Sequence, residues 1–373
     1  MIDKTKGFNW GPGLFLILYQ LVLLATLPYY LYYHLSSIGI WIIAFILLYL
    51  TGISITGGYH RYYAHKTYKI NHPLVEILLL FFSSMSLQGS ALRWAFDHRL
   101  HHAHVDTDKD PYSIKKGFWY AHFLWILEKP APIDSKIVPD LMRNKLVMFQ
   151  EKYSIPLMIA TNVLVFLAIG WIFNDFWGSF FVVTWLRIFA LHHFTWFINS
   201  LAHTWGDKPF CQEQTAVNNF VIALLTFGEG YHNFHHTFAN DYRNGIRWFQ
   251  FDPTKWVLWT LSKLGCIHSL KKMGDATIKK RMVLERKDLL LKQIKDLWYL
   301  KKDEIAKQIE EISERLLEQL SRFNQLELEY RALAISRQAL KMEIKAIQKN
   351  MRSDWRQWSQ LSRLILHLKP LPA

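Results

Sequence analysis

The stretch "GLFLILYQLVLLATLPYYLYYHLSSIGIWIIAFILLYLTGISITGG", residues 13–58, decides the fold, because it is apolar over nearly its whole length. It divides into two uncharged runs, 13–34 and 38–58, that only a short polar segment separates. Each run has about 20 residues, enough for a helix to cross a bilayer core of about 30 Å. The stretch therefore predicts a tight hairpin of two membrane-spanning helices.

A second pair of apolar runs follows later in the chain. "IPLMIATNVLVFLAIGWIF" covers 155–173, and "FWGSFFVVTWL" covers 176–186 and continues as "RIFALHHFTWFINSLAH" to residue 203. This pair predicts a second hairpin, which gives an all-α membrane protein with four spans in residues 1–274. A fifth stretch at 74–90 is shortened by Glu76, and it predicts a helix at the membrane interface.

Charge predicts the orientation of these helices. The net charge is +14, yet the two hairpin loops contain no lysine or arginine, whereas 59–154 and the chain after the fourth span are rich in both. The positive-inside rule then places both termini and the long connection in the cytoplasm. Nothing resembles a nucleic-acid recognition module, so the basic charge indicates anionic lipid as the partner and not nucleic acid. The two cysteines, Cys211 and Cys266, are expected to be free thiols.

Histidines carry the chemical signal. Ten of the 17 histidines lie in four short clusters, "HRYYAH", "DHRLHHAH", "NSLAH" and "GEGYHNFHH", and all of them except His104 are candidate ligands. Two clusters repeat the spacing HxxHH, whose offsets share one face of a helix. Neutral imidazole is a common ligand of transition metals, so we expect a metal site on a cytoplasmic helical cap. The predicted ligands are His60, His65, His98, His101, His102, His203, His232, His235 and His236.

Nine nitrogen donors are too many for one metal, so two metals are expected to share them. Imidazole serves zinc, copper, iron and nickel, and the ligand set alone does not choose among these metals. A site on membrane helices indicates a lipid substrate and the oxidation of an inert C–H bond. Iron with dioxygen supplies that oxidising power, whereas zinc does not.

Four sequence blocks carry a family resemblance over residues ~10–270. "GGYHRYYAH", "WAFDHRLHHAHVDTDKDPY", "FINSLAHTWG" and "GEGYHNFHHTFANDYRNGIRWFQFD" resemble, in this order, the motifs of membrane fatty acyl desaturases of the stearoyl-CoA Δ9 type. The segment "FANDYRNG" resembles bacterial members most. The resemblance favours a bacterial inner membrane as the location, with the endoplasmic reticulum membrane as the eukaryotic counterpart.

The resemblance also implies an activity. Such enzymes hold two iron ions on the nine histidines and use O2 and two external electrons to remove two hydrogens from a saturated acyl chain. The expected product is a cis-Δ9 chain made from a C16–C18 acyl-CoA. In this family an asparagine holds a metal-bound water, and Asn199, one turn before His203, falls on its position.

Further residues near the histidine clusters are candidates for supporting roles. Asp97, Asp106 and Asp110 are candidates for orienting imidazoles by hydrogen bonds. Animal acyl-CoA enzymes have a basic residue just before the Asp-His of the second cluster, where this chain has Phe96. Despite this departure acyl-CoA remains the first choice of carrier, with acyl-lipid and acyl-ACP as alternatives. The candidates for the headgroup phosphates are Arg93, Lys115, Lys116 and Lys129.

Residues 275–373 form a charged extension without glycine or proline between Gly274 and Pro370. A heptad series runs through it, which predicts a coiled coil that self-associates or a helical hairpin that folds on itself or on the enzyme. The core positions are Ile305, Ile309, Ile312, Leu316, Gln319, Phe323, Leu326, Tyr330, Leu333, Arg337, Leu340, Ile344, Ile347 and Met351.

The extension carries no haem signature, so the electrons are expected to come from a separate protein such as ferredoxin or cytochrome b5. Two rival functions remain at this point. A histidine-box hydroxylase or alkane monooxygenase shares the metal class, and a membrane metal-binding transporter or scaffold belongs to another class. Product mass separates the first rival, because hydroxylation adds an oxygen whereas desaturation removes two hydrogens.

Overall fold

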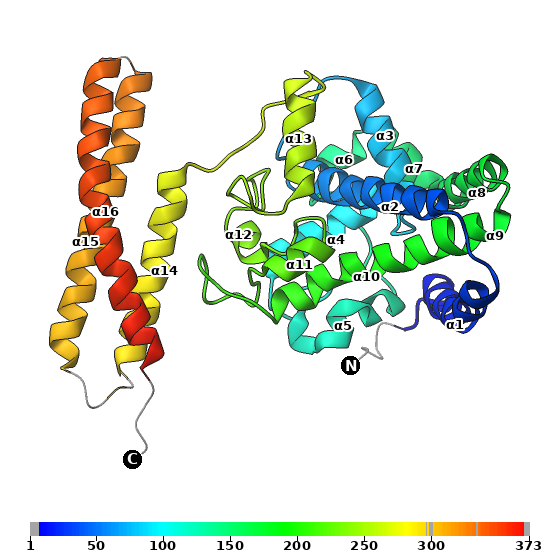
Figure 1. Ribbon diagram of the computed structural model, residues 1–373, viewed down its shortest axis with the longest axis horizontal. Coiled ribbons are helices and arrows are strands. Elements are labelled where there is room, and N and C mark those ends of the chain that lie inside the picture. Colours follow the sequence, from blue (N-terminus) through cyan, green and yellow to red (C-terminus); the bar gives the residue numbers. More distant parts are fainter. Residues whose placement is uncertain (1–6, 296, 298–300, 333–334, 369–373) are drawn as a thin grey trace. The chain divides into compact units, whose positions relative to one another are not determined.

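The computed structural model describes residues 7–295, 297, 301–332 and 335–368 (Figure 1). Four helical segments are long and apolar enough to cross a membrane, which confirms the predicted spans. They are α1 (Trp10–Tyr33); α2 (Ile38–Ile53) with η1 (Ser54–Ala64); α8 (Ser154–Ile172); and α9 (Phe176–Gly178) with η4 (Ser179–Leu186), α10 (Arg187–Asn199) and η5 (Leu201–His203).

The two hairpin turns are tied together by one carboxylate. Asp175 accepts hydrogen bonds from Ser36 Oγ at 2.7 Å and from the backbone N–H of Gly178 at 2.7 Å, and it lies 3.0 Å from His34 Nε2. A Cβ on Gly178 would collide with Asp175 and Ser36, so only glycine allows this approach. The contact fixes the two hairpins side by side.

Short helices connect and cover the hairpins. Pro73–Ser84 is the fifth apolar stretch, and as a separate helix of 12 residues it is too short to span a bilayer. The elements are α3 (Pro73–Ser84), α4 (Ala91–His104), η2 (Ile114–Lys116), α5 (Phe118–His122), η3 (Leu124–Leu127), α6 (Pro139–Met142), α7 (Lys145–Lys152), α11 (Phe220–Leu225), α12 (His232–Thr237) and α13 (Pro253–Lys263). One antiparallel pair of two-residue strands joins β1 (Lys69–Ile70) to β2 (Ile267–His268).

The core beside the second span positions α4. Tyr59 and Ala95 are fully buried, and Phe96 is also buried there, against the cluster that Val147 of α7 completes. Phe96, the departure from the animal pattern, is thus a packing residue, with the guanidinium of Arg93 5.3 Å from the centre of its ring. Apolar packing therefore holds the histidine-bearing α4 against η1.

The chain divides into two units, Met1–Asp207 with Gln214–Lys272 and Lys208–Glu213 with Met273–Ala373. The second unit contains α14 (Asp275–Lys295), α15 (Lys302–Arg331) and α16 (Arg337–His367). The links between these helices are short, so neighbours run antiparallel in a three-helix bundle (Figure 1). Its core includes Val283, Leu290, Ile309, Leu316, Leu320, Trp358 and Ile365.

The heptad series of the extension is divided between two helices. α15 ends at Arg331, and Ser336 caps α16 by accepting a hydrogen bond from the backbone N–H of Ala339 at 3.2 Å. Within one chain α15 and α16 share an apolar core, as a hairpin requires, and self-association stays a prediction. Leu333 of the series lies outside the described residues.

Candidate metal centre

The nine histidines gather into two groups. Within each group the candidate ligand atoms all lie within 4.8 Å of one another, a spacing that one metal ion can bridge. The first group contains His60, His65, His98, His102 and His235, and the second contains His101, His203, His232 and His236. All nine predicted ligands are thus brought together, divided five and four.

The HxxxxH spacing is explained by a π-helix. The backbone N–H of His65 donates to the carbonyl of His60 at 3.1 Å, the i to i+5 bond of a π-turn. This wider turn places the two side chains on one side, with ring centroids 4.8 Å apart. The second span therefore ends with two ligands for the same group.

The two HxxHH motifs lie on α4 and α12, and each helix supplies both groups. On α4, His98 and His102 join the first group while His101 joins the second. On α12, His235 joins the first group, whereas the other two histidines of the motif join the second. The His102 ring of α4 stacks on the His236 ring of α12 with centroids 4.3 Å apart. The two groups are therefore adjacent.

The ring nitrogens converge inside each group. The Nε2 atom of His235 lies 2.9 Å from that of His60 and 3.0 Å from that of His102. Burial and the neighbouring imidazoles hold the pKa of His102 and His235 well below the usual histidine range, so these rings are neutral and offer lone pairs. Lone pairs that face one another at this distance suit a shared cation. The donor set therefore fits a transition metal in each group.

The other ring nitrogen of several ligands has its own partner. His101 Nδ1 lies 2.9 Å from Asp110 Oδ1, and His98 Nδ1 lies 3.0 Å from the hydroxyl of Tyr112. His203 Nδ1 lies 2.8 Å from Thr215 Oγ1. Such contacts fix the tautomer and the orientation of a ligand ring. The imidazoles are therefore held in place by the protein itself.

Glu229 connects the metal site to a buried ion network. Its carboxylate lies 3.1 Å from His60 Nδ1 and 3.0 Å from an amino group of Arg61, which also donates to Asp252 at 2.9 Å. Burial would raise the pKa of Glu229, but His60 and Arg61 outweigh it and lower that pKa below its usual value. The carboxylate is therefore ionised and orients His60.

The three predicted aspartates have different positions. Asp110 contacts a ligand ring directly, and Asp106 acts through Thr215, whose hydroxyl donates to Asp106 Oδ1 at 2.6 Å. Asp97 pairs with Arg93 at 2.6 Å and contacts no ligand ring among the described residues. Burial raises the pKa of Asp97 to about 6 despite that arginine.

Glu229, Tyr112 and Thr215 were not among the residues predicted from the sequence. Glu229 and Tyr112 lie inside the quoted motif blocks, so their position next to the histidines was an available signal. Thr215 had no such signal, because it follows His203 by 12 residues and reaches the ring only through the fold.

The histidines outside the motifs lie outside both groups. His192 contacts the hydroxyl of Tyr19 at 2.7 Å and the carbonyl of Ser86 at 2.9 Å, so its role is hydrogen-bonded packing, as expected for a histidine inside a span. His193 lies 3.1 Å from His122 Nε2. His104, the last residue of α4, is in neither group.

A cavity of about 830 Å³ begins at the metal site. His60, His98 and Asn199 line it near the ligands, and aliphatic and aromatic side chains of α1, α8 and η4 line it farther on. Arg93 and Lys129 lie on its wall, whereas Lys115 and Lys116 are not among its lining residues. The cavity offers a long apolar ligand a place beside the first histidine group.

Comparison with known proteins agrees with this architecture. The family model described as "Fatty acid desaturase" matches residues 36–267. The chain is 41% identical over 252 residues to a "Probable acyl-CoA desaturase" of Schizosaccharomyces pombe, covering 67% of this chain and 52% of that protein. It is 39% identical over 251 residues to "Acyl-CoA desaturase 1" of Saccharomyces cerevisiae, covering 66% of this chain and 49% of the relative.

A relative from Nostoc sp. is named for a different substrate. The "sn-2 palmitoyl-lipid 9-desaturase" of Nostoc sp. is 38% identical over 219 residues, which cover 57% of this chain and 74% of that protein. The chain spans about half the length of the two yeast relatives that it matches. The match of the family model over residues 36–267, together with these identities, shows that the chain belongs to the fatty acid desaturase family.

Proposed function

We propose that this protein is an O2-dependent fatty acyl desaturase that holds two iron ions on its nine clustered histidines. The observation that carries the proposal is a largely apolar cavity of about 830 Å³ that His60 and His98 of the first histidine group line. A saturated acyl chain suits such an apolar cavity, because burial of its methylene groups supplies the free energy of binding. Two irons bound by these imidazoles would supply the oxidising power for O2 activation.

The residues around the site orient the metal ligands and line the cavity proposed for the acyl chain. Glu229 and Asp110 hold the rings of His60 and His101, so the ligand geometry does not depend on the metal alone. Trp94 and the aromatic residues of the cavity wall exclude water from the acyl chain. Asn199 ends α10 beside the ligands, where its side chain is suited to hold a water molecule for one metal. The net reaction consumes O2, two electrons and two protons and yields one double bond and two waters.

The finer parts of the proposal concern substrate and position. We favour a C16–C18 acyl-CoA and a cis-Δ9 product. Several relatives are named acyl-CoA desaturases, among them one Δ9 enzyme and two Δ11 enzymes, and two relatives are named lipid 9-desaturases. Arg93 and Lys129 line the cavity, as does Lys109, and their positive charge would suit a polar headgroup.

The remaining parts concern the surroundings. The distribution of lysine and arginine supports a cytoplasmic active site, with both termini on the same side of the membrane. The electron donor is a separate protein, either ferredoxin or a cytochrome b5, which a basic surface suits. Asp110 and Asp106 keep the proposed role of orienting imidazoles, directly and through Thr215, whereas Asp97 holds Arg93 instead.

Expression in a host that lacks unsaturated fatty acids tests the proposal. Product analysis by mass is expected to show the loss of two hydrogens, and the purified protein is expected to hold about two irons per chain. His235→Ala removes a ligand of the first group and is expected to abolish the product, whereas the control His104→Ala leaves it unchanged. A product heavier by one oxygen, or unchanged unsaturation in His235→Ala, would refute the proposal.

A further inference from the structure

Helix α16 of the second unit has an unusual charge distribution. It carries seven lysines and arginines but only two acidic residues. The seven cations follow one another at intervals of three, four or seven residues, so they form a single stripe along one face of the helix. The cationic stripe consists of Arg337, Lys341, Lys345, Lys349, Arg352, Arg356 and Arg363, and all seven are exposed.

The two acidic residues of α16 do not neutralise this stripe. Asp354 is buried and contacts Arg315 of α15 at 3.2 Å, and Glu343 pairs with Arg322 of α15 at 2.9 Å. Within the part of the chain that the structure describes, none of the seven cations forms an ion pair. The stripe is therefore a surface of one sign, which attracts an anionic partner.

The stripe is straight and faces away from the bundle core. Trp358 and Ile365 bury the other side of the helix against the two neighbouring helices. From Arg337 to Arg363 the helix rises about 39 Å at 1.5 Å per residue, so the cations define a line that can lie along a flat surface. Met342 and Leu364, 66% and 68% exposed, lie beside this line.

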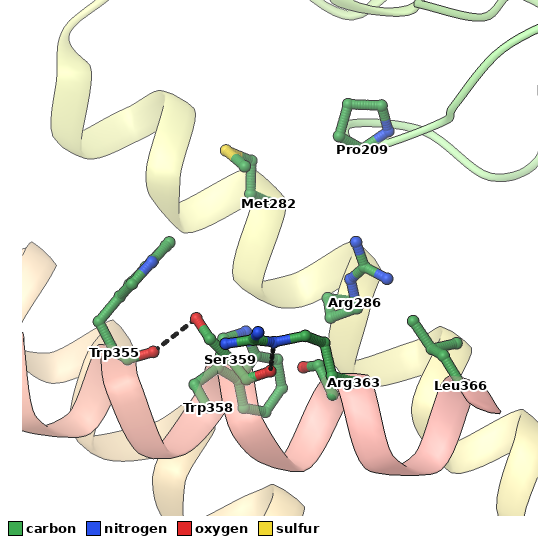
Figure 2. Close-up of a pocket in the computed structure, with 9 residues that line it drawn as sticks. Pro209, Met282, Arg286, Trp355, Trp358, Ser359, Arg363 and Leu366 are labelled. Carbon is green, nitrogen blue, oxygen red and sulfur yellow. Dashed lines mark hydrogen bonds between the residues drawn. The ribbon is translucent and has the colours of Figure 1, made fainter. Parts of the chain in front are cut away.

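A pocket at the C-terminal end of the stripe adds a second feature (Figure 2). Arg286 of α14 and Arg363 of α16 line it together with Trp355 and Trp358, and its volume is about 270 Å³. Ser362, also on its wall, is 7% exposed, and its hydroxyl has no hydrogen-bond partner among the described residues. Two guanidiniums, an unpartnered hydroxyl and indole rings suit a phosphate group attached to an apolar body.

We infer that the cationic stripe binds the anionic phospholipid surface of the membrane in which the same chain is embedded, with a lipid phosphate in the Arg286–Arg363 pocket. The membrane is always within reach, because α14 begins at Asp275, three residues after the first unit ends at Lys272. Each lysine or arginine near the surface of an anionic leaflet increases the binding affinity by about fivefold. Nucleic acid is disfavoured, because no aromatic side chain interrupts the middle of the stripe to stack on bases.

The full-length protein in lipid nanodiscs tests this inference. The rate at which an amine-acylating reagent modifies Lys341, Lys345 and Lys349 is measured by mass spectrometry in discs of phosphatidylglycerol and in discs of phosphatidylcholine. The rate is expected to fall severalfold in the anionic discs only. Added salt at about 1 M, where the Debye length is about 3 Å, is expected to remove the protection. Exposed Lys279, Lys280 and Lys292 of α14 are internal controls whose rates stay equal.

Variants identify the source of the protection. A triple variant keeps the three reporter lysines and replaces the last three cations of the stripe: Arg352→Gln, Arg356→Gln and Arg363→Gln. Its affinity for the anionic membrane is expected to fall by about 100-fold, which is about fivefold for each cation removed. Lys279→Gln, Lys280→Gln and Lys292→Gln together are the matched control and leave the protection unchanged. Equal acylation in both kinds of disc would overturn the inference, and so would protection that appears only when a single-stranded oligonucleotide is added. Thermal unfolding and desaturation by the variants stay at wild-type levels, so this outcome is independent of the proposed enzymatic function.

Discussion

The two units use charge in opposite ways. In the first unit, Arg61, Glu229 and Asp252 form an ion network whose side chains are at most 1% exposed. In the second unit, Arg322 and Glu343 form an ion pair whose side chains are 38% and 46% exposed. A buried charge that loses its partner cannot be solvated, whereas water replaces the partner of an exposed charge. The stability of the first unit therefore depends on individual charged residues, whereas the stability of the bundle depends little on any single ion pair.

This difference predicts its largest effect at Glu229. Glu229→Ala leaves the buried Arg61 with less compensation and is expected to destabilise the first unit by about 3–5 kcal/mol. The matched change in the bundle, Glu343→Ala, is expected to cost less than about 1 kcal/mol. Thermal unfolding in detergent measures both, and equal effects would contradict the comparison.

Metal binding is expected to show the next largest effect. Asp110→Asn removes the charge that orients His101, and the affinity for the metal is expected to fall by about 10–100-fold. Asp97→Asn is the control, because its side chain pairs with Arg93 and touches no ligand ring among the described residues. Bound iron is measured after dialysis against a chelator. A similar loss of bound iron in both variants would mean that the contact between Asp110 and His101 does not determine the affinity for the metal.

A pH effect is expected at His122, which lies on α5. Burial, followed by the neighbouring His193, lowers the pKa of His122 to about 4, whereas an unfolded histidine titrates near 6.5. Protons therefore bind the unfolded chain more readily, and the stability that His122 contributes above pH 6.5 is lost as the pH falls towards 4. His122→Gln is expected to reduce the fall in melting temperature across this window. An unchanged pH profile in the variant would exclude His122 as the source.

The smallest effect is expected in the bundle. Arg322→Gln and Glu343→Gln together remove the exposed pair, and the expected change in the free energy of unfolding is below about 1 kcal/mol. Unfolding is followed by circular dichroism, since the bundle is helical. A loss comparable to that of Glu229→Ala would show that exposed charges in the bundle are as critical as the buried network.

The bundle and the metal site also differ in how far they are predictable. Apolar length alone predicts the spans, since a bilayer requires about 20 apolar residues per crossing. The heptad series predicts helices in the extension but not where they turn, because the same pattern suits a long coiled coil and a hairpin. Short links and the packing of Trp358 and Ile365 against the other helices favour the bundle.

By itself the sequence determined which residues are apolar enough to enter the membrane and which nine imidazoles are candidate ligands, because composition and spacing along one chain record both. The five-and-four division of these ligands and the roles of Glu229, Tyr112 and Thr215 were decided only by the tertiary structure. The physical reason is distance along the chain: His60 and His235 are 175 residues apart, and only the packing of η1, α4 and α12 brings their ring nitrogens to 2.9 Å.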